Sequence, residues 1–308
     1  MAQTKTTKPA MTLAHVEREF ATEGACKALL TNLRWPDGKV HCPRCGLSVK
    51  VYALKARPFH WVCKHCGKNG YRFSVLTGTV FENTNVPLTI WFRVAFLMVS
   101  SKKGISALQV HRMIPPVRGK KGSYKTAWYM CHRLRAAMND GTFPLLQGEV
   151  EVDETYVGGK EGNRHVSKRR GRGAGYKDKV PVIGAISRKG NVVCQMIEKA
   201  DERTLTRFVR ETVSDKVSLV ATDEHMGYSP LSVAGYPHET VSHTKEEYVR
   251  GNIHTQNLDS FWSLLKRGIV GTYHKVSKNH LPLYLNEFSW RHNHRNDPEI
   301  FKAVLAGC

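Results

Sequence analysis

Hydrophobic positions in the second half of the chain follow two different periods, and each period predicts a different element. In the run GEVEVDET, valines alternate with acids, which is the pattern of a half-buried strand that carries Asp153. The apolar run 217–221 is long enough for a buried strand, and Asp223 lies just beyond it. The segment around Asp259 has a helical period instead. The pattern therefore predicts two strands and one helix, each bearing an aspartate.

These three aspartates indicate a specific chemistry if the fold brings them together. Carboxylates from two strands and a helix can hold a pair of divalent cations about 3.5–4 Å apart, an arrangement that stabilises the attacking and leaving oxygens in phosphoryl transfer. We therefore expect Asp153, Asp223 and Asp259 to form a catalytic site that acts on the phosphodiester bonds of a nucleic acid.

The rest of this half predicts an α/β domain. VPVIGAIS and NVVCQMIE are expected to form a hairpin, and residues 202–213 have the pattern of a helix. Three meandering strands, a helix and a further strand resemble the ribonuclease-H-like arrangement, which brings acids from adjacent strands to one edge. The basic stretch 164–179 lacks apolar periodicity, so it is either ordered by a phosphate backbone or is a plain solvated charge run. Its candidate nucleic-acid contacts are Lys168, Arg169, Arg170 and Arg172.

Two helices that precede the catalytic segment have the order of a helix-turn-helix. Ser106 can cap the helix ALQVHRMI, and after a turn of eight residues Ser123 can cap a second helix that ends near Met138. The second helix has a buried stripe of Ala127, Cys131, Leu134 and Met138. Its other faces carry Tyr124, Lys125, Trp128, Tyr129, His132, Arg133 and Arg135, and we take Lys125, Trp128 and Arg133 as DNA contacts. A helical hairpin that only packs the domains together is the alternative.

Four of the eight cysteines form two knuckles, HCPRCG and WVCKHCG, with 17 residues between them. This spacing matches a zinc site of four thiolates, in which Gly46 and Gly67 allow the chain to turn back towards the metal. A disulfide pair and a redox motif are the alternatives, and a reducing cytosol and the repetition of the knuckle argue against them. The expected ligands are Cys42, Cys45, Cys63 and Cys66. Because four thiolates leave no open coordination position, this zinc should stabilise the fold and perform no chemistry. The other cysteines are interpreted as buried or terminal thiols: Cys26, Cys131, Cys194 and Cys308.

The chain is strongly basic, with 47 Lys and Arg against 26 Asp and Glu and a formal charge of +21 over 308 residues. Such a field attracts polyanions, so DNA or RNA is the natural partner, although a ribosome-associated protein or a membrane-surface protein shares this feature. The most apolar run, 90–99, is short and contains Arg93, and residues 1–12 lack the apolar core of a secretory signal. We therefore expect a cytoplasmic, nucleoid-associated bacterial protein with no membrane partner.

A series of short motifs resembles one known family. LRWPDG precedes the first knuckle, GISALQ and YKTAW follow the second, and then come EVDETYVGGK, TDEHMGY, FWSLLKRGIVGTYHKVSKNHL and YLNEFSWRHNHR. This order, over about residues 14–303, resembles the zinc-ribbon DDE transposases of bacterial insertion sequences, of the ISXO type or IS-fifteen-ninety-five family. The resemblance implies a ribonuclease-H-like catalytic domain, two Mg²⁺ or Mn²⁺ ions, and cutting and joining of DNA at the ends of a mobile element. By motif position, Asp153 and Asp223 correspond to the first two catalytic acids.

At the third catalytic position the chain departs from this family. Members more often have an asparagine after His-Thr and a glutamate three residues later, where this chain has Gln256 and Asp259. We favour Asp259, because 35 residues separate it from Asp223, a spacing typical of transposases and integrases. Lys266, seven residues after Asp259, lies on the same helical face, so its cation can approach the phosphate. Gln256 could ligate a metal through its amide oxygen or position DNA.

Other polar and aromatic residues near the acids have less specific interpretations. Alternation sends Glu154 to the face opposite the first acid, and Glu151 is expected to repel its neighbour or to bind the basic loop. His225 and His254 are interpreted as structural, and Trp262 as a core aromatic.

The predicted order is a disordered tail (1–12), an N-terminal helix with the zinc ribbon (13–75), a helix-turn-helix-like region (76–140) and a catalytic domain (145–304). The first two folded regions should recognise terminal inverted repeats, and the whole chain should act on repeats and target DNA as a dimer or larger assembly. Two rival interpretations are a DNA-binding regulator derived from an inactive transposase and a metal-dependent nuclease.

Overall fold

The structure is a computed structural model that describes residues 11–116, 119, 122–139, 144–159, 165–168, 179–188, 190–223, 226–241 and 254–308. The chain forms two compact units, Met1–Asn139 with Asn296–Cys308, and Asp140–Arg295. The last helix of the chain packs within the first unit, whereas the catalytic domain predicted from the sequence runs to residue 304. Most of the predicted tail, 1–12, lies outside the described residues.

Helices of the first unit enclose an aromatic core. The ring of Phe20 lies 5.2 Å from that of Phe92 and 5.9 Å from that of Phe301, measured between centroids. Since Phe301 is on the last helix of the chain, the C-terminal segment completes a core that begins near the N-terminus. The helices that meet here are α1 (Leu13–Glu19), α2 (Glu23–Arg34), α3 (Leu88–Ser100) and α10 (Ile300–Ala306).

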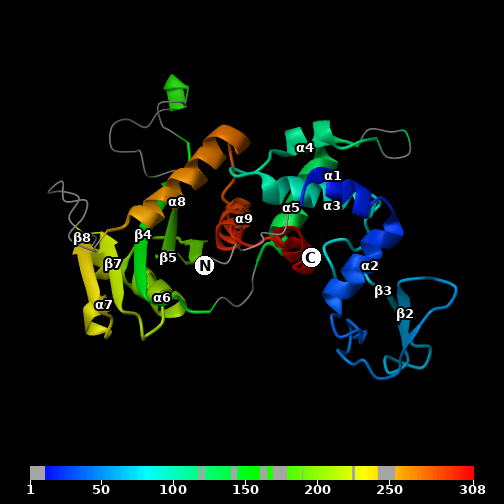
Figure 1. Cartoon of the computed structure of the whole chain (residues 1–308). Coiled ribbons are helices and arrows are strands. Elements are labelled where there is room, and N and C mark those ends of the chain that lie inside the picture. The colour runs from blue at the N-terminus through cyan, green and yellow to red at the C-terminus, as the bar shows by residue number, and fades with distance from the viewer. Residues whose placement is uncertain are drawn as a thin grey trace, which may run out of the picture. The chain divides into compact units, whose positions relative to one another are not determined.

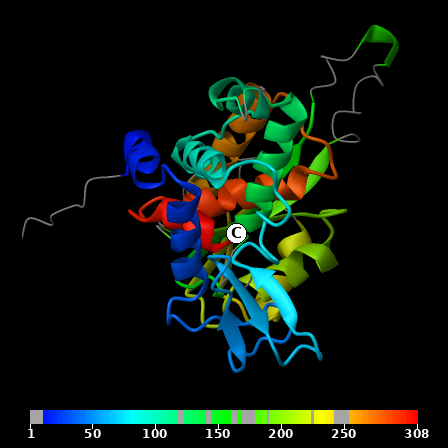
Figure 2. The ribbon, with the colours of Figure 1, turned by 90° about the vertical axis from the view of Figure 1, so that its right-hand side faces the viewer.

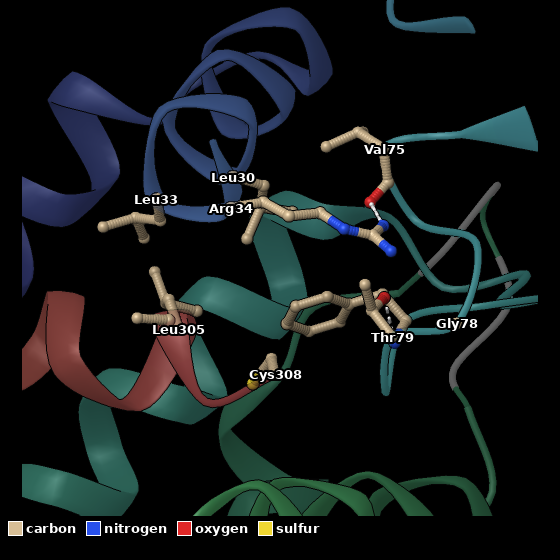
Figure 3. Close-up of a pocket in the computed structure, with 10 residues that line it drawn as sticks. Leu30, Leu33, Arg34, Val75, Gly78, Thr79, Leu305 and Cys308 are labelled. Atoms are coloured by element: carbon tan, nitrogen blue, oxygen red, sulfur yellow. Dashed lines mark hydrogen bonds between the residues drawn. The ribbon is translucent and has the colours of Figure 1, made fainter. Parts of the chain in front are cut away.

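A small antiparallel sheet follows α2 in the first unit (Figure 2). Its strands, in sheet order, are β1 (Val51–Ala53), β2 (His60–Cys63) and β3 (Tyr71–Ser74). Arg34 connects α2 to the segment after β3, because its Nη1 donates a 2.7 Å hydrogen bond to the carbonyl oxygen of Val75. Figure 3 shows this guanidinium beside a pocket lined by Leu30, Leu33 and Leu305, and burial lowers the pKa of Arg34.

The two helices predicted as a helix-turn-helix are present, as α4 (Ala107–Met113) and α5 (Tyr124–Ala137). Ser106 and Gln109 form a capping box at the start of α4, and Ser123 caps α5, as expected. The predicted stripe of α5 is buried, but so are His132 and Arg135, which are 7% and 1% exposed. The basic face of α5 is therefore narrower than the sequence pattern indicated.

The second unit contains a mixed five-stranded sheet in the order β6-β5-β4-β7-β8. Its strands are β4 (Glu149–Val157), β5 (Val180–Ser187), β6 (Val192–Met196), β7 (Leu219–Asp223) and β8 (His238–Val241). The first three form an antiparallel meander, whereas β7 and β8 run parallel to β4. The hairpin and the two acid-bearing strands predicted from the sequence are thus confirmed.

Helices cover both faces of this sheet. On one face, Val150 and Val152 pack with residues of α6 (Glu202–Thr212), η3 (Met226–Tyr228) and α7 (Pro230–Val233). On the other face lie α8 (Gln256–Arg267), the π-helix η5 (Gly268–Tyr273) and α9 (Leu281–Asn293) (Figure 1). Because side chains alternate along β4, Glu151 and Asp153 face α8. Among the described residues, no helix combines the length and apolar character that a bilayer crossing needs.

Candidate active site and metal centre

The four predicted zinc ligands converge at the edge of the small sheet. Their Sγ atoms all lie within 4.8 Å of one another, and the distance is 3.8 Å both from Cys42 to Cys66 and from Cys45 to Cys63. A tetrahedral zinc with Zn–S bonds of about 2.3 Å has sulfur–sulfur edges of about 3.8 Å. None of the four sulfurs is in a disulfide, and their geometry is the one that zinc requires, so they support a structural zinc ion.

The chain around these cysteines is shaped for the same purpose. Gly46 and Gly67, which follow the two knuckles, have φ of 73° and 94°, a conformation in which glycine avoids a steric penalty. Hydrogen bonding with Cys45, followed by burial, raises the pKa of the Cys66 thiol to about 12. Four thiolates can therefore stand together only around a cation, which fits a zinc site better than a group of free thiols.

The first two predicted catalytic acids lie side by side on neighbouring parallel strands. Glu149, Val150 and Glu151 of β4 pair with Leu219, Val220 and Ala221 of β7. Continuing this register by two residues brings Asp153 level with Asp223. Carboxylate oxygens of Asp153, Asp223 and Glu154 all lie within 4.8 Å of one another. The strand-borne pair predicted from the sequence is thus brought together by the β4–β7 pairing.

Glu154 corrects one expectation. The hydroxyl of Tyr228 donates a 2.6 Å hydrogen bond to Glu154 Oε2. Tyr228 belongs to the core on the α6 face, which is the face on which alternation places Glu154. Nevertheless the Glu154 carboxylate extends into the acidic cluster, so its placement on the other face did not remove it from the site. Burial, with the Glu154 charge and hydrogen bond, raises the pKa of Tyr228 well above its ordinary value, so this hydroxyl stays a hydrogen-bond donor.

Asp259 reaches the same region from α8. It lies outside the 4.8 Å cluster, in which the described acids are Asp153, Glu154 and Asp223. Its charge nevertheless acts on Asp153: burial first, and then repulsion from Asp223, Glu154 and Asp259, raises the pKa of Asp153 to about 7. Several carboxylates that disfavour one another's ionisation form the kind of oxygen-rich site that a divalent cation relieves.

The three site residues predicted on α8 are exposed to solvent. Gln256 is the first residue of the helix, Asp259 is in its first turn, and Lys266 is in its last. Their exposed side chains leave them accessible to a large substrate.

Trp262 has a role that sequence reasoning missed. It is 3% exposed, as a core aromatic should be, but its Nε1 also donates a 2.9 Å hydrogen bond to Asp153 Oδ2. The ring fits because Gly184, the β5 partner of Asp153, has no side chain: a Cβ there would lie 2.7 Å from the Trp262 ring. A glycine within an otherwise apolar strand was the available signal, because it marks a close approach.

The candidate nucleic-acid contacts differ in the contacts that their side chains make within the protein. Lys125 is exposed on α5, whereas the Trp128 ring stacks on His132 at 3.9 Å. Arg133 lies over the Tyr129 ring and its Nη1 donates to the carbonyl oxygen of Glu82 at 3.2 Å. Lys168 ends the short helix η2 (Val166–Lys168), while Arg169, Arg170, Arg172 and His225 lie outside the described residues.

A four-cysteine site followed along the chain by a cluster of carboxylates defines a class of protein, in which a zinc ribbon precedes a domain with an acidic site. Residues 21–69 match the model of a transposase zinc-ribbon domain, and residues 145–293 match that of the ISXO2-like transposase domain. A protein of Halobacterium salinarum, described as an uncharacterized protein in transposable element ISH50, is 30% identical over 300 residues, which cover 94% of this chain and 97% of the relative. An uncharacterized transposase-like protein of Haemophilus influenzae is 26% identical over 122 residues, which are 39% of this chain and 97% of that protein. The chain belongs to the family of zinc-ribbon transposases with an ISXO2-like transposase domain, which confirms the resemblance seen in its motifs.

Proposed function

We propose that this transposase cuts and joins DNA at the ends of an insertion element by two-metal-ion phosphoryl transfer. The observation that carries the proposal is the convergence of Asp153 and Asp223 at one level of two parallel strands, with Asp259 close enough to act on the pKa of Asp153. The strand order β6-β5-β4-β7-β8, with an antiparallel meander beside two parallel strands, supports a ribonuclease-H-like catalytic domain.

The residues that would hold the ions have suitable chemistry. Carboxylate oxygens are hard ligands, which Mg²⁺ and Mn²⁺ prefer. In the proposed site, Asp153, Asp223 and Asp259 would hold these ions. When bound, the ions would supply Lewis acids on the attacking and leaving oxygens of the phosphodiester.

The side chains around the acids contribute orientation and charge. Trp262 holds Asp153 in one orientation by its hydrogen bond to Oδ2. Lys266, seven residues after Asp259 on α8, carries a charge suited to a phosphate oxygen. Gln256 is proposed to position DNA or to add an amide ligand. Water would attack first and a 3′-hydroxyl later, so that no covalent bond to the protein is needed.

The first unit is proposed to recognise the element ends. Its zinc ribbon and the α4–α5 pair, acting as a helix-turn-helix, would bind the terminal inverted repeats, with Lys125, Trp128 and Arg133 towards the DNA. The basic loop, with Lys168, Arg169, Arg170 and Arg172, would hold the phosphate backbone. Because two ends must be joined, we propose a dimer or larger assembly.

Cleavage and joining of labelled DNA tests this function. The substrate is a duplex carrying the inverted repeat found beside the gene, and the products with Mg²⁺ or Mn²⁺ are resolved on a denaturing gel. We expect nicking at the repeat and transfer of the 3′-end to target DNA. Asp223→Asn should lower the rate by about 10³-fold or more, because several kcal/mol of charge stabilisation are lost, while DNA binding remains.

Each rival interpretation has its own outcome. Hydrolysis without end joining would indicate a nuclease, and binding without cleavage would indicate a regulator. Normal cleavage by Asp223→Asn would contradict the metal-site assignment.

A further inference from the structure

The start of α8 is capped by a residue from a distant strand. The first N–H groups of a helix lack partners within the helix, and a side chain at the N-cap usually accepts from them. The N-cap of α8, Thr255, makes no such side-chain bond among the described residues. Instead, Glu151 Oε2 on β4 accepts from the backbone N–H groups of Asn257 at 2.9 Å and Leu258 at 3.0 Å.

Two further contacts join Glu151 to this segment. Asn257 Nδ2 donates to Glu151 Oε1 at 2.7 Å, and Nδ1 of His254 lies 3.2 Å from the same oxygen. Arg188 Nε donates to Oε1 at 3.4 Å from the end of the neighbouring strand. The Glu151 side chain is fully buried, and a buried carboxylate is tolerated only when partners of this kind surround it.

Glu151 therefore differs from the other acids of the sheet. Carboxylate oxygens of Asp153, Glu154 and Asp223 lie within 4.8 Å of one another, whereas both oxygens of Glu151 accept from donors at the start of α8. Its negative charge also stands at the positive end of the α8 dipole. The sequence did not predict this capping contact; most of the basic loop, which Glu151 was expected to bind, lies outside the described residues.

The position of the cap connects it to the third acid. Glu151 and Asp153 are two residues apart on β4 and face the same side, and Asp153 accepts from Trp262 of α8. The helix is thus attached to β4 at residues 257–258 and again at Trp262. Asp259 lies between these two attachments.

We propose that Glu151 is a positioning residue for Asp259. It fixes the first turn of α8 against β4 and so sets the position of Asp259 relative to Asp153. The inference rests on the proposed function in one respect, the role of Asp259 as the third metal ligand.

The test compares zinc-loaded full-length variants by hydrogen exchange and by calorimetric titration with Mn²⁺. Glu151→Gln keeps the shape but puts an amide N–H₂ where one carboxylate oxygen accepted. Glu149→Gln is the matched control: Glu149 is on the same strand and pairs with the same Arg188, but within the described part of the chain no hydrogen bond or ion pair joins it to α8. Asn257→Ala, which removes the side-chain amide with its Nδ2 donor but keeps both backbone N–H donors, is a milder variant in case Glu151→Gln folds poorly.

In Glu151→Gln, we expect amides of residues 256–260 to exchange about tenfold faster, while those of α9 are unchanged. Mn²⁺ affinity should fall by about tenfold, the lower end of what outer-shell residues contribute. Asn257→Ala should show smaller effects of the same sign, and Glu149→Gln should match the wild type.

Three results would overturn the proposal. One is wild-type exchange in both Glu151→Gln and Asn257→Ala, which would show that Glu151 does not cap α8. Another is faster exchange with unchanged Mn²⁺ affinity, which would make the cap purely structural. The third is an equal loss of affinity in Glu149→Gln. Failure of the wild type itself to bind Mn²⁺ would contradict the proposed function as well, and is distinguished from these results by the wild-type titration alone.

Discussion

The zinc ribbon and the acidic site differ in how their ligands are brought together. The ribbon takes its four sulfurs from two short knuckles within 25 residues of chain, from Cys42 to Cys66, and each knuckle is a local turn. The acids come from β4, β7 and α8, and more than 100 residues separate Asp153 from Asp259. The ribbon is therefore a closed site made by local geometry, whereas the acidic site exists only when the sheet and its covering helix are assembled.

The two sites also differ in charge balance. Four thiolates fill the coordination sphere of one zinc and leave no position open. The acids repel one another, and the raised pKa of Asp153 records that repulsion together with burial. We infer that the first site stabilises the fold, while the second opposes folding until a cation is bound. The following predictions test this contrast.

Loss of a zinc ligand should have the largest effect. Metal binding supplies roughly 10–16 kcal/mol in zinc-finger peptides, so Cys63→Ser, at a fully buried ligand, should unfold the ribbon. Zinc content per chain and thermal unfolding would measure this. Cys194→Ser, at a thiol that contacts Ser289 in the second unit, is the control and should keep its zinc. A full zinc complement in Cys63→Ser would refute the four-thiolate site.

Replacement of the third acid should come next. Asp259→Asn should lower the cleavage rate by about 10³-fold, an effect of about 4 kcal/mol. Glu154→Gln should lower it by less than about tenfold, because Tyr228 already occupies one Glu154 oxygen. Single-turnover cleavage with saturating Mg²⁺ separates the two. If the order of the two losses is reversed, Glu154 and not Asp259 completes the site.

Removal of the Asp153 charge should stabilise the metal-free protein. The pKa of Asp153 in the folded state is about 7, above its ordinary value of 3.8, so the folded state holds the proton more tightly. The free energy of unfolding therefore falls as pH rises from about 4 to about 7. At pH 8 without added Mg²⁺ or Mn²⁺, the free energy of unfolding of Asp153→Asn should exceed that of the wild type by about 2–4 kcal/mol, and this difference should nearly vanish at pH 4.

Urea unfolding of the variant beside the wild type at each pH value measures this difference, because any loss of zinc at pH 4 affects both proteins alike. Mg²⁺ should raise the stability of the wild type at pH 8 and leave Asp153→Asn nearly unchanged. A gap that does not depend on pH would show that repulsion at Asp153 is not its cause.

Crowding next to Asp153 should have the smallest effect of the four. In Gly184→Ala the new methyl would meet the Trp262 ring at 2.7 Å, and such overpacking costs about 1–3 kcal/mol. Gly159→Ala is the control, because its Cβ would meet no atom of the described residues within 4 Å. Equal unfolding midpoints for the two variants would mean that the ring moves freely and does not fix Asp153.

Much of the secondary structure in both units could be predicted because its patterns are local. Alternating valines predicted β4, and the apolar run before Asp223 predicted β7. Serine caps predicted the starts of α4 and α5. Burial of His132 and Arg135 could not be predicted in this way, because the width of a buried helix face depends on the elements packed around it.

The sequence by itself determined the candidate zinc ligands and the three candidate acids, because residue type and short spacing are enough to specify a knuckle, a strand or a helix. Only the tertiary structure decided that Glu154 joins the acids, that Trp262 holds Asp153, and that Glu151 caps α8. These contacts join residues as far as 109 positions apart. Their existence depends on strand register and on the close approach of α8 at Gly184, which no local pattern encodes.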